Sequence, residues 1–181
     1  MKKIIIGLTG QMSCGKGTVA EYLEKKYGAS TYRFSSMLRD VLNRLYLEIT
    51  RHNMQTLSTL IRKNFSEDLM ARVMAKDVKS DNNNLIVIEG IRRMADIKYL
   101  QELENFKLIS IEADSKVRYE RLTKRTENKG DTEKTYKEFM DDHKTEAESE
   151  IPKTMEHADI IINNNGDLKK LYKQIDDLIN T

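Results

Sequence analysis

The sequence predicts one α/β domain in three layers, with a five-stranded, mostly parallel β-sheet that carries helices on both faces. The chain has 181 residues, which is the usual size of a single domain. Short apolar segments alternate along it with segments whose apolar residues recur every three or four positions. Such alternation is typical of parallel sheets, because a helix usually connects one parallel strand to the next. With 8 Gly and 1 Pro, the composition also favours helices over an all-β sandwich.

Five short segments are predicted to be strands. Two of them are nearly continuous apolar runs, as expected of strands that are covered on both faces. The predicted strands span residues 3–9, 30–34, 85–89, 106–112 and 159–162.

Helical patterns fill the segments between the predicted strands. A helix over about residues 15–27 follows the first strand. Apolar residues recur at helical spacing over residues 38–49 and again over residues 168–179. A further apolar face spans residues 69–74, and we expect Ser66 to cap that helix.

Composition argues against several classes of function. The 31 basic and 29 acidic residues give a net charge of +2, a bias too small to favour a nucleic-acid or membrane binder. The single cysteine, Cys14, cannot form an internal disulfide, and the first apolar run ends at Gly7, too early for a membrane span. We therefore expect a cytoplasmic protein without a nucleic-acid or membrane partner, and the sequence leaves its oligomeric state open.

Residues 10–18, GQMSCGKGT, form the most specific motif in the chain. They match G-x-x-x-x-G-K with a hydroxyl residue one position late, and they lie between a predicted strand and a predicted helix. The glycines let backbone N–H groups turn inward around phosphate oxygens, and the start of the helix adds partial positive charge. Lys16 supplies an ammonium for the β- and γ-phosphates, and Thr18 offers a hydroxyl to a phosphate or to a metal-bound water. The residues predicted to bind the nucleotide here are Gly10, Ser13, Cys14, Gly15, Lys16, Gly17 and Thr18.

Nearly the whole chain resembles the P-loop nucleotide kinases, a group that includes nucleoside and deoxynucleoside monophosphate kinases, adenylate kinases and dephospho-CoA kinases. The segment GKGT at residues 15–18 is similar to that of adenylate kinases. Further motifs follow in the order of the family: SSMLR at 35–39, GIRR at 90–93, RLTKR at 121–125 and ADIIINNNG at 158–166. The resemblance implies a P-loop NTPase fold with a small helical lid, ATP as phosphoryl donor and Mg²⁺ as cofactor.

The resemblance also implies roles for basic residues on both sides of the transferred phosphoryl group. Arg39 and either Arg92 or Arg93 would bind the acceptor phosphate, beside Ser35, Ser36 and Gly90. Arg121 and Arg125 are four residues apart and would share one helical face as a clamp on the donor. The predicted catalytic residues are Lys16, Arg39, Arg92, Arg121 and Arg125.

Two further roles follow from the resemblance, each beside a simpler structural alternative. Glu89, at the end of the third strand, would hold Mg²⁺ through water together with Thr18, or it is only a charged strand end. Asn164, Asn165 and Gly166 would form a turn against the adenine, or they form an ordinary left-handed turn. Ser35 and Ser36 are equally consistent with helix caps.

Two regions of the single domain, residues 1–181, are predicted to surround the site. Residues 36–80 would form a helical acceptor-binding region. Residues 118–151 are rich in charge and poor in aliphatic side chains, so we expect a moving lid or a static, solvated helical hairpin. Its packing anchors would be Tyr119, Leu122, Tyr136 and Phe139.

The choice of acceptor depends on the position four residues before Arg39. Dephospho-CoA kinases carry an aspartate there, which suits a hydroxyl acceptor that must lose a proton. This chain has Ser35. A phosphate acceptor is already ionised at neutral pH and needs no base. The sequence therefore favours phosphorylation of a nucleoside or deoxynucleoside monophosphate to the diphosphate. The alternatives are a dephospho-CoA kinase and a P-loop ATPase switch that phosphorylates no metabolite.

Overall fold

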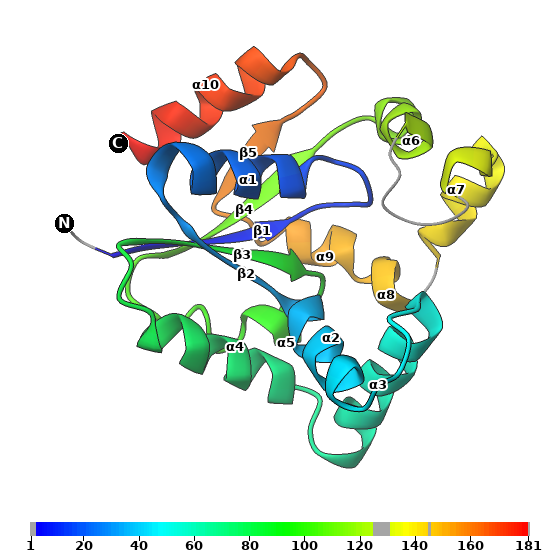
Figure 1. The fold of residues 1–181 in the computed structure, drawn as a ribbon. Helices are drawn as coiled ribbons and strands as arrows, with labels where there is room; N and C mark the ends of the chain where they lie inside the picture. The colour runs from blue at the N-terminus through cyan, green and yellow to red at the C-terminus, as the bar shows by residue number, and fades with distance from the viewer. Residues whose placement is uncertain (1–2, 125–130, 145, 181) are drawn as a thin grey trace.

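A five-stranded parallel sheet forms the centre of the computed structural model, which describes residues 3–124, 131–144 and 146–180. Its strands lie in the order β2-β3-β1-β4-β5, and each neighbouring pair is parallel (Figure 1). Their bounds are β1 Ile4–Thr9, β2 Ser30–Arg33, β3 Leu85–Ile91, β4 Phe106–Glu112 and β5 Ile160–Asn163. The predicted α/β class and the five predicted strands are confirmed, and the sheet is parallel throughout.

Helices cover both faces of this sheet. α1 (Lys16–Tyr27) and α10 (Leu168–Ile179) pack on one face, while α4 (Leu69–Ser80) and α5 (Met94–Ile97) lie on the other (Figure 1). The core is correspondingly divided. Leu8 belongs to the cluster under α1 and α10, whereas Ile5 of the same strand packs with the α4 side. This division follows from the strand geometry, because successive side chains point to opposite faces.

The predicted helix over residues 38–49 is wrong at its carboxyl end. α2 (Phe34–Arg44) stops at Arg44, and Tyr46 then adopts a left-handed conformation with φ 57°. A separate helix, α3 (Arg51–Asn64), starts after Thr50, whose side chain accepts a hydrogen bond from the backbone of Asn53. The apolar residues between the two helices are exposed, so their spacing did not mark a buried helical face.

Ser66 does not cap the following helix. α4 begins after Asp68, and the Ser66 hydroxyl donates to the Asp68 carboxylate and accepts from the side chain of Arg72, not from a backbone N–H of the first turn. The third strand also runs further than predicted, to Ile91. It includes Gly90, which has a φ of 83°.

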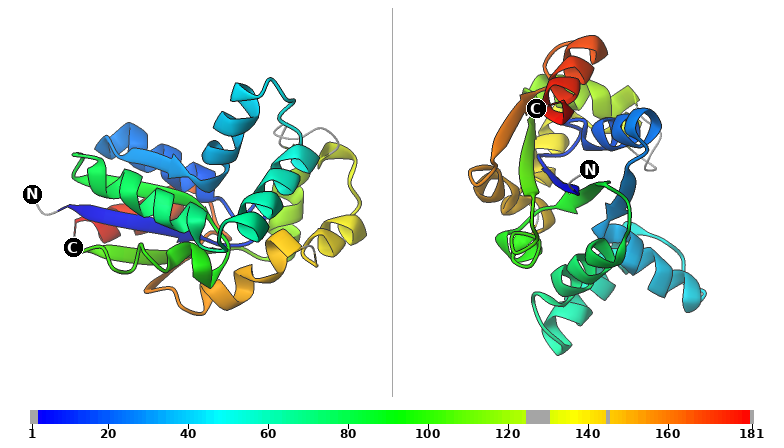
Figure 2. Two further views of the ribbon diagram at one scale, coloured as in Figure 1. Left: turned by 90° about the horizontal axis from the view of Figure 1, so that it is seen from below. Right: turned by 90° about the vertical axis from the view of Figure 1, so that its left-hand side faces the viewer.

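Short helices follow the fourth strand. They are α6 (Ser115–Lys124), the 3₁₀ turn η1 (Asp131–Glu133), α7 (Tyr136–Asp142), α8 (Glu146–Ser149) and α9 (Ile151–Met155). Phe139 of α7 is fully buried in a small cluster with Met12 and Leu122, beside Tyr119. Two views place α3 and α7 near the end of the sheet where the loop after β1 lies (Figure 2). Among the described residues no helix is both long enough and apolar enough to cross a membrane.

Candidate functional site

The loop between β1 and α1 has a backbone that demands glycine at two positions. Gly10 has φ 144°, and a Cβ there would lie 2.5 Å from the carbonyl oxygen of Ile111. Gly15 has φ 108°, and a Cβ there would lie 2.3 Å from Nδ2 of Asn164. Ser13 between them also has a positive φ, 59°. The motif of residues 10–18 therefore forms a tightly wound loop against β4 and the end of β5.

Lys16 extends along this loop at the start of α1. Its Nζ donates hydrogen bonds to the carbonyl oxygens of Gly10, at 2.6 Å, and Gln11, at 3.1 Å. Within the described residues no side chain caps the amino end of α1. Its first N–H groups and the nearby ammonium provide the positive potential that a phosphate needs at a helix start.

Asn164, predicted only as part of a turn against the adenine, holds the phosphate loop in place through its side chain. Its buried Nδ2 donates to the carbonyl oxygen of Cys14 at 2.8 Å, and its backbone N–H donates to the backbone carbonyl oxygen of Glu112 at 2.7 Å. The predicted Asn165 instead accepts a hydrogen bond from the backbone of Asp114 at 2.7 Å and is exposed, as is Gly166. In a run of three asparagines, the sequence does not indicate which side chain is turned toward the loop.

Two arginines of α6 approach the same loop. Arg121 donates from Nη2 to the carbonyl oxygen of Asn164 at 2.8 Å. Arg118, a residue that sequence reasoning missed, donates to the carbonyl oxygen of Met12 at 3.2 Å and lies 2.6 Å from Nε2 of His143. Burial lowers the pKa of Arg118. Arg125 lies outside the described residues.

Buried polar atoms without a partner mark this side of the site. In the described part of the chain, both Ser13 Oγ and Arg121 Nη1 are buried without a hydrogen-bond partner. Because unpaired buried donors and acceptors are costly, such atoms require an explanation, and a bound anion beside the loop would supply one.

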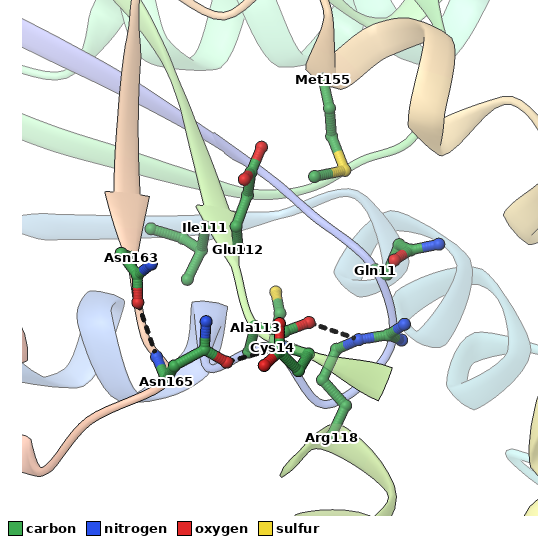
Figure 3. Close-up of a pocket in the computed structure, with 10 residues that line it drawn as sticks. Gln11, Cys14, Ile111, Glu112, Ala113, Arg118, Met155, Asn163 and Asn165 are labelled. Carbon is green, nitrogen blue, oxygen red and sulfur yellow. Dashed lines mark hydrogen bonds between the residues drawn. The ribbon is translucent and has the colours of Figure 1, made fainter. Parts of the chain in front are cut away.

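A pocket of about 390 Å³ opens beside the loop, at the carboxyl ends of β4 and β5. Arg118 and Asn165 lie on one side of it next to Cys14, with Met155 opposite (Figure 3). This volume is in the range of small-molecule sites. Cys14 is buried and contributes its backbone carbonyl to the contact with Asn164.

Charged side chains from β2, β3 and the loop after β3 form ion pairs with carboxylates. Glu89, a residue of β3 that is 9% exposed, accepts a hydrogen bond from Nη2 of Arg33 at 2.9 Å. Arg92 pairs with the buried Glu148 of α8 at 3.3 Å, and Arg93 pairs with Glu67 at 3.0 Å. The two predicted acceptor arginines therefore have different carboxylate partners.

The remaining predicted acceptor residues lie on α2 and at its start. Arg39 is exposed on α2. Ser35 and Ser36 lie in the first turn of that helix, whose N-cap position is Arg33, so neither serine is the cap. Thr18 is half-buried in the first turn of α1.

Comparison with known proteins identifies the family. The profile of the AAA_17 family, described as an AAA domain, matches residues 9–139, a span that starts at the phosphate loop and covers most of the chain. The chain belongs to this family. The predicted resemblance to P-loop kinases is thereby confirmed at the level of a P-loop kinase-like domain.

Relatives of this AAA-domain protein extend over nearly its full length. It is 27% identical over 173 residues to a UPF0200 protein of Staphylothermus marinus, a match that covers 96% of this chain and 89% of the relative. It is 28% identical over 181 residues to a UPF0200 protein of Pyrococcus abyssi, with 97% and 95% covered.

Solved structures with the same fold include shikimate kinases. The shikimate kinase of Bacteroides thetaiotaomicron superposes with a TM-score of 0.66 at 17% identity, over 98% of this chain and 99% of that one. The enzyme of Aquifex aeolicus gives a TM-score of 0.59 at 20% identity, over 98% and 96%. At these identities the likeness shows the shared fold.

Proposed function

We propose that this protein is an ATP-dependent kinase that phosphorylates a nucleoside or deoxynucleoside monophosphate to the diphosphate. The observation that carries the proposal is the arrangement around the amino end of α1. Lys16 and the loop lie on the donor side, and Arg33 and Glu89 lie next to the first turn. Phosphoryl transfer consists largely of positioning and charge neutralisation, and this arrangement can supply both.

The residues around the loop fit ATP and Mg²⁺. Ser13 Oγ and Arg121 Nη1 are the buried, unpartnered polar atoms on the donor side, where phosphate oxygens would satisfy them. Thr18 and Glu89 offer the oxygen ligands that Mg²⁺ prefers, alone or through water. When bound, the metal would supply neutralisation of the charge on the phosphates. Lys16, the loop N–H groups and Gly17 would hold the donor, with Asn165 and Gly166 near its base.

The proposed transfer needs no general base. An oxygen of the acceptor phosphate forms a bond to the terminal phosphorus of ATP. The bond from that phosphorus to the bridging oxygen breaks, and its electron pair leaves on ADP. Because the second pKa of a phosphate monoester is about 6, the attacking oxygen is ionised at neutral pH. Arg39 and Arg92, with Arg93, Ser35, Ser36 and Gly90 nearby in the chain, would orient that phosphate.

A hydroxyl acceptor is the second candidate. Asn164 bonds to the phosphate loop, which supports a role at the donor side for the ADIIINNNG segment, and that segment resembles dephospho-CoA kinases. Ser35 opposes this alternative, because it occupies the position of the aspartate that would accept the hydroxyl proton. A P-loop ATPase switch is the third candidate, and it would not require acceptor arginines.

A panel of acceptors separates these candidates. ATP turnover is measured with each ribo- and deoxyribonucleoside monophosphate, with dephospho-CoA and without acceptor. We expect one or more monophosphates to be converted. Arg39→Ala should lower kcat/KM for that acceptor by about 100-fold, as the loss of one preorganised charge typically does. The dissociation constant for ATP should change little.

Arg44→Ala is the matched control, because Arg44 is an exposed arginine in the last turn of the same helix. It should keep wild-type kinetics. Hydrolysis of ATP at one rate regardless of acceptor would indicate the ATPase switch. Conversion of dephospho-CoA alone would indicate the hydroxyl kinase, and either result would refute the proposal.

A further inference from the structure

Arg33 lies at the junction between the donor and acceptor halves of the site. It is the last residue of β2, and the next residue, Phe34, begins α2, which carries Arg39. In the register of the sheet Arg33 is paired with Glu89 of β3. Its side chain is 44% exposed, so it is accessible to a ligand.

The guanidinium of Arg33 reaches the first turn of α1. Its Nη2 is 2.9 Å from Oε1 of Glu89 and 4.0 Å from the position that a Cβ on Gly17 would occupy. The second oxygen of Glu89, Oε2, is 3.7 Å from that same position. Gly17 stands between Lys16 and Thr18, so the ion pair lies directly beside the residues that would hold the terminal phosphates.

A cation at this point addresses a specific difficulty of the proposed reaction. Transfer to a phosphate acceptor brings two anions, the terminal phosphate of the donor and the phosphate of the acceptor, into contact. Their repulsion falls when one positive group binds both. A guanidinium has five N–H donors in a planar fork, so it can bind phosphate oxygens in pairs while it keeps its bond to a carboxylate.

We propose that Arg33 is a catalytic residue that bridges the transferred phosphoryl group and an anionic acceptor phosphate, held in position by Glu89. This inference rests on the proposed function and adds a catalytic residue to it. A bridging cation is needed for two adjoining anions, whereas a neutral hydroxyl acceptor carries no charge that must be neutralised.

The test compares Arg33→Gln and Arg33→Lys with the wild type, using ATP and whichever nucleoside monophosphate the wild type converts. Arg33→Gln should lower kcat/KM for the monophosphate by about 100-fold. The dissociation constant for ATP, measured by titration calorimetry, should stay within about threefold, because Lys16 and the loop bind the donor. Arg33→Lys should recover part of the lost kcat/KM, since it keeps the charge but loses the fork.

Lys26→Gln is the matched control. Lys26 is 46% exposed and also pairs with a carboxylate, Asp176 at 2.8 Å, but it lies in the last turn of α1, away from the phosphate loop. It should retain wild-type kinetics, and the Tm of all variants shows whether each is folded. A loss in Arg33→Gln smaller than about threefold, or equal losses in ATP affinity and acceptor use without recovery in Arg33→Lys, would overturn the role of Arg33. A wild type that converts no monophosphate would instead overturn the proposed function on which it rests.

Discussion

At the scale of single residues, the phosphate loop depends on a side chain that lies far from it in the sequence. Asn164 is 4% exposed and donates to the carbonyl oxygen of Cys14, 150 residues away. Its own carbonyl oxygen accepts from Arg121. The loop, the end of β5 and α6 thus meet at one residue, whose side chain bonds to the loop and whose backbone carbonyl bonds to α6. Loss of the side chain should affect both stability and donor binding.

We predict that Asn164→Ala lowers the free energy of unfolding by about 1–3 kcal/mol, because the buried carbonyl of Cys14 loses its partner. The affinity for ATP should fall as well, since the loop loses its support. Asn165→Ala is the control, because Asn165 is exposed and bonds to Asp114. Its effect on stability should be below about 1 kcal/mol. Urea unfolding measures the stability and titration calorimetry the affinity for ATP, and equal effects of the two substitutions on stability would contradict the assignment of Asn164.

At the scale of elements, the first turn of α5 contains a half-buried carboxylate. Asp96 accepts hydrogen bonds from the backbone N–H groups of Arg92 at 2.9 Å and Arg93 at 3.0 Å. Burial raises its pKa from 3.8 to about 6, despite these bonds. This residue fixes the start of the helix directly after the two arginines predicted to bind the acceptor.

The raised pKa of Asp96 predicts a pH dependence of stability with a definite sign. Between pH 3.8 and about 6 the folded protein binds more protons than the unfolded chain, so this group adds stability as the pH falls through that window. Asp96→Asn keeps an oxygen for the two N–H groups but does not titrate. The free energy of unfolding of the wild type, relative to this variant, should therefore rise by about 1 kcal/mol from pH 7 to pH 5. A constant difference, or one of opposite sign, would contradict the raised pKa.

The segment from residue 118 to residue 151 is proposed to move as a lid. In its described part, Phe139 of α7 packs on Met12 and Leu122, and Glu148 of α8 pairs with Arg92. Motion of the segment would require these contacts to open locally. Closure over the site would exclude water, which otherwise accepts the phosphoryl group.

We predict that ATP together with a monophosphate slows amide hydrogen exchange across this segment more than across β1. Mass spectrometry of peptides from both regions measures the difference. The protein with Lys16→Ala is the control, because it should bind the donor weakly and show little slowing. Exchange that is slow without ligands and unchanged by them would indicate a static helical region.

At the scale of the whole molecule, local patterns predicted the sheet and the phosphate loop. The predicted strand 106–112 agrees with β4, because its burial follows directly from its own apolar residues. The loop was predictable because the glycines and Lys16 that define it are contiguous. The break after α2 was not predicted, since Tyr46 rather than glycine or proline adopts the left-handed conformation.

The missed parts of the candidate site are contacts between distant segments. Arg33 of β2 contacts Glu89 of the neighbouring strand β3. Arg118 of α6 contacts His143 at the end of α7. Spacing within one segment carries no information about such pairs, because they arise from the strand order and from how the helices cover the sheet edge. The sequence alone could indicate the chemistry of the donor side more fully than that of the acceptor side.

The most direct test of the proposed kinase activity is ³¹P NMR of the wild-type protein with ATP, Mg²⁺ and a mixture of nucleoside monophosphates. We predict that a new nucleoside diphosphate signal grows in step with ADP, with little inorganic phosphate. Lys16→Ala should slow this conversion by about 100-fold or more. Loss of the ATP signal to ADP and inorganic phosphate alone, at a rate that no monophosphate changes, would contradict the account.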